Sequence, residues 1–177
     1  MTRERMTHEH WVRNTLERFE TPLVRYAARL TGDVDLARDV VQDTFMKLCS
    51  ADRDQIDDYL AQWLYRVCRN RALDVMKKEK RMQPLTTEQA EARPSPARIP
   101  RDVAEGHEMM ANVLQAIDTL PEKQQEVFKL KFQDELSYKE ISSITGFPLN
   151  NVRYLIHCAL KSMREQLRGR LEATGEV

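Results

Sequence analysis

A proline-containing stretch near the middle of the chain limits what this sequence can fold into. The segment "QPLTTEQAEARPSPARIPRDVAEG" holds four of the seven prolines and almost no apolar periodicity. Prolines lack a backbone donor and oppose helix, so we expect an extended linker over residues 83–107. The 177-residue chain is thereby divided into residues 1–82 and 108–177, each long enough for one small domain.

The first part carries apolar residues at helical spacing and no clear strand signal. We expect one helix to begin with Thr21 as N-cap and Pro22 at its first position, and to stop at Gly32. A second helix follows in "DVDLARDVVQDTFMKLCS", and a third spans about residues 57–79. The preceding "HEH" is expected in a frayed terminus. These patterns predict an all-α fold.

The second part predicts a helix-turn-helix. A helix over about residues 107–119 leads to another that starts at Pro121, and Ser137 with Glu140 forms a capping-box signature. Gly146 allows a sharp turn before a helix from about Leu149. In a helix-turn-helix, the second helix enters the major groove, where Arg and Asn can read base edges. An ordinary helical hairpin is the alternative. The expected exposed side chains are Asn150, Asn151, Arg153, Tyr154 and His157.

The stretch "WLYRVCRNRALDVMKKEKR" concentrates positive charge in a chain with 28 basic and 28 acidic residues. From residue 65 to residue 82 there are seven basic and two acidic side chains, a local charge of +5. Such a strip attracts phosphates, and the neighbouring Trp63 and Tyr65 are of a type that stacks on unpaired bases. Trp63 also falls close to the buried stripe, which favours a core role for its ring over a base contact. The alternative is a solvated helix end whose cations lie near the negative end of the helix dipole.

No residue pattern favours catalysis, a cofactor or a metal. Asp39 and Asp43 flank Gln42, but no catalytic partner motif or Gly-rich phosphate loop accompanies them, so a polar face that docks a basic partner is more plausible. The three cysteines are too far apart for a zinc or disulfide motif. Because there is no export signal or long apolar run, we expect a cytoplasmic protein. Because no catalytic motif is found, we expect that it is not an enzyme.

Three segments, in order, resemble the sigma-70 family of bacterial RNA polymerase initiation factors, of the extracytoplasmic-function (ECF) type. "LTGDVDLARDVVQDTFMKL" resembles regions 2.1–2.2, and "WLYRVCRNRALDVMKKEKR" resembles regions 2.3–2.4. "LPEKQQEVFKLKFQDELSYKEISSITGFPLNNVRYLIHCAL" resembles region 4. The resemblance implies two small helical domains: region 2 over residues 1–82, which binds core polymerase and the −10 element, and region 4 over residues 108–177, which binds the −35 element. Promoter recognition and melting would then lead to transcription initiation.

The resemblance also implies partners and roles for particular residues. Core polymerase would be contacted at the β′ clamp helices and the β flap, and an anti-sigma factor is expected as a further partner. Asn70 matches a family position that contacts a flipped-out base. The implied polymerase-binding residues are Asp39, Gln42, Asp43 and Phe45, with Phe45 contributing from the core side. The implied −10 residues are Trp63, Arg66, Arg69, Asn70, Arg71, Lys77, Lys78 and Arg81, and the implied −35 residues are those given above for the helix-turn-helix.

Two departures from the family pattern keep other functions open. Leu155, Cys158 and Leu160 occupy positions that are basic in the family, so the −35 sequence cannot be carried over. The acidic segment "SADRDQIDD" differs from the usual loop before the −10 helix and leaves the −10 preference open. The alternatives are a stand-alone helix-turn-helix regulator and a helical protein-interaction module that has lost DNA binding.

Overall fold

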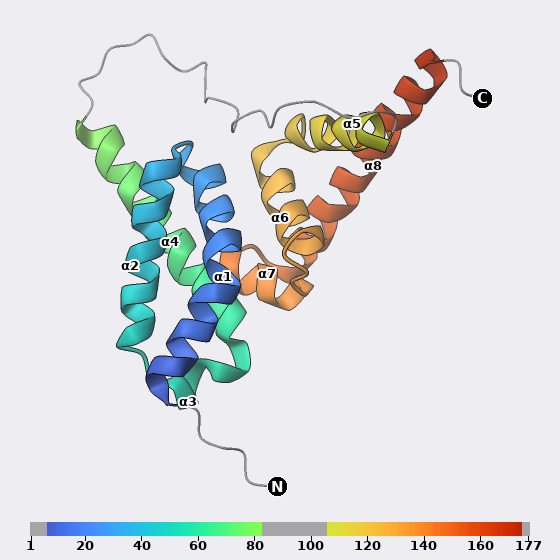
Figure 1. Cartoon of the computed structure of the whole chain (residues 1–177). Helices are drawn as coiled ribbons and strands as arrows, with labels where there is room; N and C mark the ends of the chain where they lie inside the picture. The colour runs from blue at the N-terminus through green and yellow to red at the C-terminus, as the bar shows by residue number, and fades with distance from the viewer. Residues whose placement is uncertain (1–6, 83–105, 175–177) are drawn as a thin grey trace, which may run out of the picture. The chain divides into compact units, whose positions relative to one another are not determined.

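The computed structural model describes residues 7–82 and 106–174, and all regular elements in these two ranges are helices (Figure 1). The described helices belong to two compact units, α1 to α4 in the first and α5 to α8 in the second. The expected linker at residues 83–107 lies, except for its last two residues, outside the described ranges. Within those ranges, no helix has the length and apolar character needed to span a membrane.

The first helix corrects an expectation from the sequence. Helix α1 (His8–Thr31) is continuous, Thr7 is its N-cap, and Pro22 lies inside it. A proline inside a helix costs about 3 kcal/mol. Here Phe19 and Leu23 on either side of Pro22 are buried, and this packing keeps the helix intact across the proline. The terminus is therefore not frayed at "HEH", because both histidines lie in the first turn of α1.

The other first-unit helices pack against α1 and against each other. Gly32 stops α1 in the left-handed region at φ 75°, as expected, and Asp33 caps helix α2 (Val34–Cys49) by accepting from the Leu36 N–H. The short helix α3 (Arg53–Ile56) and one 3₁₀ turn, η1 (Asp57–Tyr59), lead into α4 (Leu60–Met82). The acidic segment is thus largely helical.

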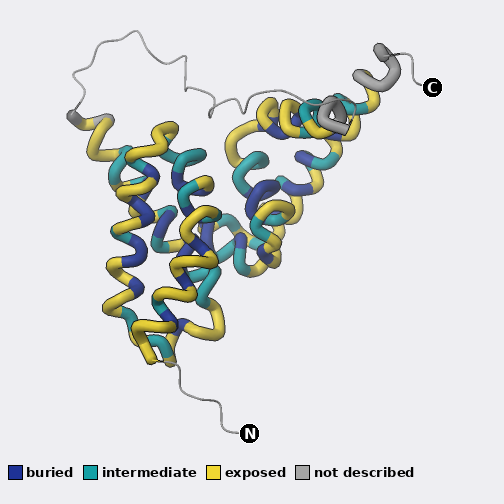
Figure 2. The backbone as a smooth tube through the Cα atoms, viewed as in Figure 1, coloured by how far each residue is buried: buried dark blue, intermediate teal, exposed yellow. Residues whose placement is uncertain are grey.

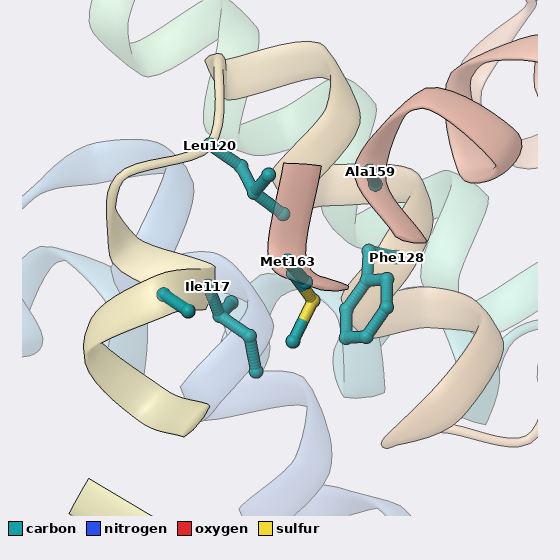
Figure 3. Packing of buried hydrophobic residues seen from close by; sticks show 6 residues of the cluster. Ile117, Leu120, Phe128, Ala159 and Met163 are labelled. Carbon is teal, nitrogen blue, oxygen red and sulfur yellow. The ribbon is translucent and has the colours of Figure 1, made fainter. Parts of the chain in front are cut away.

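The second unit is built around its last helix. Helices α5 (Gly106–Asp118), α6 (Glu122–Phe132) and α7 (Tyr138–Thr145) all contact α8 (Leu149–Thr174). Figure 3 shows part of the core that results, where side chains from the α5 end, α6 and α8 meet. The labelled residues there are Ile117, Leu120, Phe128, Ala159 and Met163.

Local signals fix the turn between α7 and α8. Ser137 accepts from the Glu140 N–H, and the Glu140 carboxylate accepts from the Ser137 N–H, which completes the expected capping box. Gly146 then ends α7 at φ 76°, a conformation that glycine adopts without steric cost. Figure 2 shows buried and exposed residues interspersed along the helices, as amphipathic packing requires.

Candidate nucleic-acid interface

One exposed arc of α4 brings together five of the eight expected −10 residues. At 100° per residue, these five positions fall within an arc of about 60°, opposite the buried Leu64, Cys68 and Ala72. The Trp63 side chain is half-buried, and the other four side chains are exposed. This arc, called the α4 face below, consists of Trp63, Arg66, Asn70, Lys77 and Arg81. It therefore combines an aromatic ring, an amide and three cations.

The remaining three expected −10 residues lie beside the α4 face. Arg71 and Lys78 are exposed on one flank, and Arg69 is half-buried on the other. Arg71 is engaged by α2, because its Nε donates to Asp43 Oδ2 at 2.6 Å. This ion pair joins a residue expected to bind DNA to one expected to bind polymerase. Both side chains keep about two fifths of their surface exposed, at 43% and 40%.

Helix α2 presents a polar face that the sequence predicted only in part. Asp39 and Gln42 are exposed and Asp43 is half-buried, all opposite the buried stripe of the helix. Phe45 lies in the core at 7% exposure, so it supports α2 from inside and is absent from the exposed face. Met46 shares the exposed arc and is 65% exposed. Its position seven residues after Asp39, two helical turns along, is the signal that could have identified it.

The segment that precedes α4 is tied to the start of α1. The Trp11 indole N–H donates to Asp57 Oδ1 at 2.9 Å, across 46 positions of sequence. Arg53 pairs with the same carboxylate at 3.6 Å and lies over the Trp11 ring. His8 Nε2 lies 3.0 Å from the carbonyl oxygen of Cys49 at the end of α2. The first two contacts fix the acidic segment against α1 and the third fixes the end of α2 there, and no local sequence pattern predicts them.

The second unit exposes all five residues expected to meet the −35 element. Asn150, Arg153 and His157 share an arc of about 60° on α8, and Asn151 and Tyr154 lie farther around the exposed side. Tyr154 is 64% exposed, and its hydrogen bond with the Cys158 side chain raises the pKa of the phenol. The hydroxyl therefore stays protonated at neutral pH and can act as a donor.

The apolar residues of α8 at positions that are basic in the family pattern do not create a large exposed patch. Leu155, Cys158 and Leu160 are each half-buried, and Leu160 packs against the core of the second unit. They therefore add stability to α8 more than they add surface for another protein. Among the described residues, no three His, Cys, Asp or Glu side chains are grouped so that they could hold a metal ion.

Comparisons with known proteins agree with these two regions. Residues 15–82 match the family model of sigma-70 region 2, and residues 110–163 match that of sigma-70 region 4. The ECF RNA polymerase sigma factor SigW of Bacillus subtilis is 29% identical over 159 residues, covering 85% of each chain. The sigma factor SigV of the same organism is 28% identical over 144 residues, covering 81% of this chain and 82% of SigV.

A solved structure shows the same fold. The sigma factor RpoE of Bartonella quintana, crystallised with the anti-sigma factor NepR, aligns with a TM-score of 0.64 over 88% of this chain and 96% of the other, at 23% identity. Together, the two family models match more than half of the chain, and they match it in family order. The chain therefore belongs to the sigma-70 family, as an ECF-type sigma factor that serves RNA polymerase in transcription initiation.

Proposed function

We propose that residues 1–82 act as region 2 and residues 108–177 as region 4, and that the chain works by binding and not by catalysis. The observation that carries this proposal is the α4 face, because an amide and three cations share one exposed arc within the region 2 match. Cations on such an arc neutralise backbone phosphates, and the Trp63 ring adjoins them.

The α4 face binds the −10 element as the strands separate. Asn70 contacts an extruded base of the non-template strand, and Arg66, Lys77 and Arg81 hold phosphates on either side of it. Extruding a base costs a few kcal/mol of stacking and pairing energy, and contacts made only with the extruded base offset part of that cost. This preference for the open form drives promoter melting.

The exposed face of α2 docks on core polymerase at the β′ clamp helices. Asp39, Gln42 and Asp43 offer acceptors to a basic surface, and the neighbouring Met46 adds an apolar contact that becomes buried on docking. The variant Asp39→Lys should weaken polymerase affinity. Glu17→Lys, an exposed reversal on α1, should leave that affinity unchanged and serves as the control. Equal affinities for both variants would remove α2 from the docking surface.

The helix-turn-helix of the second unit binds the −35 element as duplex DNA. The first turns of α8 enter the major groove, where Asn150, Asn151 and Arg153 meet base edges and Tyr154 and His157 complete the contact. The outer surface of this unit rests on the β flap. An anti-sigma factor is a further partner, since a structural relative was crystallised with one. The chain works in the cytoplasm, where polymerase is found.

Transcription with purified core polymerase tests the proposal. The protein is incubated with core polymerase and fragmented host genomic DNA, and the transcript starts are sequenced. Discrete starts absent from core alone are expected. Alanine at Arg66, Arg69 and Asn70 should abolish them. A matched control replaces Arg13, Asn14 and Arg25, two arginines and one asparagine exposed on α1, and should initiate normally.

The other outcomes point to different functions. Promoter opening that survives the α4 triple substitution would mean that the −10 surface lies elsewhere. Tight duplex binding without polymerase binding would favour a stand-alone regulator. Polymerase binding without transcripts and without DNA binding would favour a protein-interaction module.

A further inference from the structure

A buried tryptophan of α1 is bonded to the segment that leads into α4. Trp11 is 3% exposed, and its indole N–H donates to Asp57 Oδ1 at 2.9 Å. Arg53 pairs with Asp57 Oδ2 at 3.6 Å, and its guanidinium carbon lies 5.8 Å from the centroid of the Trp11 ring. Figure 1 shows α3, which begins at Arg53, beside the first turns of α1. We call these three residues, Trp11, Arg53 and Asp57, the segment clamp.

The clamp acts on elements that are too short to hold their position alone. Helix α3 has four residues and η1 has three, whereas isolated helices shorter than about 12 residues are marginal in water. Among the seven residues of these two elements, Ile56 is the one that is buried. Trp11, in contrast, belongs to a 24-residue helix that packs against both α2 and α4. The position of the segment therefore depends on its bond to Trp11.

The clamped segment ends at the α4 face. Tyr59, its last residue, is 44% exposed and lies four residues, about one helical turn, before Trp63. An aromatic ring at that point can stack on an unpaired base. Asp54 and Asp58 are exposed on the same segment, and their carboxylates repel backbone phosphates. A strand that follows the cations of the α4 face should therefore turn a base, and not a phosphate, toward this end.

We propose that Trp11 is a positioning residue for −10 recognition: by holding Asp57, it sets where Tyr59 lies at the end of the α4 face, and thereby which unpaired base is preferred there. This inference rests on the proposed function of the α4 face and deepens it, because it adds a buried residue of another helix. A shift of the segment leaves the cations of α4 in place and changes mainly the contacts with the base. Trp11 therefore affects the choice among promoters more than the affinity for DNA as a whole.

Transcription by the full chain with core polymerase tests this role. The template pool carries a −10 element recovered from genomic DNA, with each position randomised in turn, and the measured quantity is the ratio of starts among the four bases at each position. Trp11→Phe keeps an aromatic ring and the net charge but removes the N–H donor. It should change the ratio at one or two neighbouring positions by about two- to tenfold, the range expected for one hydrogen bond, and leave the other positions as in wild type.

Two variants of Asp57 separate the bond from the charge. Asp57→Asn removes the charge but keeps an oxygen that can accept from the Trp11 indole, so it should stay close to the wild-type ratios. Asp57→Ala removes both and should shift the same positions as Trp11→Phe. Because both changes act through one bond, the double variant should shift the ratios no further than the larger single change. The Asp57 side chain is 45% exposed, so Asp57→Ala serves as the test if Trp11→Phe does not fold.

A matched control shows whether general loosening of α1 is enough. Phe19→Leu also shrinks a buried aromatic residue of α1, about 12 Å farther along the helix, and should leave the ratios unchanged. Unchanged ratios in both Trp11→Phe and Asp57→Ala, an equal shift in Phe19→Leu, or a shift in Asp57→Asn as large as in Asp57→Ala would each overturn the inference alone. Absence of transcripts with the wild-type protein would refute the proposed function and this inference together.

Discussion

Helices α4 and α8 both expose a basic face, yet the two faces differ in chemistry. The α4 face mixes Trp63 and Asn70 with its cations, and Asp74 lies at its edge. The basic face of α8 is made of cations and one histidine: Arg153, His157, Lys161, Arg164 and Arg168. A mixed face suits unpaired bases, which offer both a surface for stacking and edges for hydrogen bonds. A face of one sign suits a duplex backbone, which offers mainly charge. We therefore expect α4 to act on separated strands and α8 to hold duplex DNA.

The cysteines of the two helices also differ in burial. On α4, Cys68 and Leu64 are fully buried. The helix packs against α1 and α2, and its Arg71 pairs with Asp43 of α2. On α8, Cys158 is half-buried, although Val152 and Ala159 of the same helix are fully buried. The two cysteines therefore report on different environments, the core of the first unit for Cys68 and a partly exposed side of α8 for Cys158.

Thiol labelling should show the largest contrast between the two helices. Burial raises the pKa of Cys68 to about 12, so its reactive thiolate is roughly 10⁻⁴ of the thiol at pH 8. We expect Cys158 to react with a thiol reagent in the folded protein and Cys68 to react slower by at least about 10³-fold, the loss of thiolate that follows from raising its pKa from 9.0 to about 12, as measured by mass spectrometry of digested peptides. Comparable rates would mean that α4 opens locally and exposes Cys68 to solvent.

Truncating a buried side chain should destabilise only the unit that contains it. Leu64→Ala in α4 and Ile156→Ala in α8 each remove a buried aliphatic side chain, and each should cost about 2–5 kcal/mol of unfolding free energy. Hydrogen exchange on the intact chain should speed up in α1, α2 and α4 for the first variant and in α6, α7 and α8 for the second. Faster exchange throughout both units would show that they fold as one.

Alkaline pH should weaken the support of α4 specifically. The pKa of Cys68 is raised from 9.0 by burial, so the folded state holds this proton more tightly than the unfolded state does. The resulting stability is complete below pH 9 and is lost as the pH rises toward 12. Wild type should lose about 1.4 kcal/mol more than Cys68→Ala between pH 7 and pH 10, measured by urea unfolding. Cys158→Ala should behave like wild type.

The ion pair between α2 and α4 should have the smallest effect. An exposed pair contributes about 0.2–1 kcal/mol, so Asp43→Asn should raise the affinity of the free protein for a single-stranded −10 oligonucleotide by no more than about fivefold, as Arg71 becomes available. Asp39→Asn, on the same face of α2, should leave this affinity unchanged. If the gain from Asp43→Asn persists when Arg71 is replaced by alanine, the pair is not its cause.

Local signals explain what could be predicted from the sequence. Gly32 and Gly146 end helices where expected, and Ser137 with Glu140 forms the expected capping box, because each signal is satisfied within a few residues. The all-α fold and the family follow from such patterns. The assignment of individual residues to polymerase, the −10 element and the −35 element remains a prediction.

The errors arose where distant contacts decide the structure. Pro22 looked like a helix start, but burial on both sides of it keeps α1 continuous. The bond between Trp11 and Asp57 joins positions 46 residues apart, and no local pattern encodes it. The pair between Arg71 and Asp43 joins two helices in the same way, and the role of Arg71 at the −10 element stays a prediction.

The two tryptophans of the chain give it a pair of built-in optical probes. Trp63 lies on the α4 face, where a stacked base would quench its emission. Trp11 is hydrogen-bonded to Asp57 beside the start of α4, so its spectrum reports whether the acidic segment stays attached to α1. With one tryptophan replaced by phenylalanine at a time, DNA engagement and rearrangement of the protein could be timed separately in one stopped-flow experiment, without an added dye.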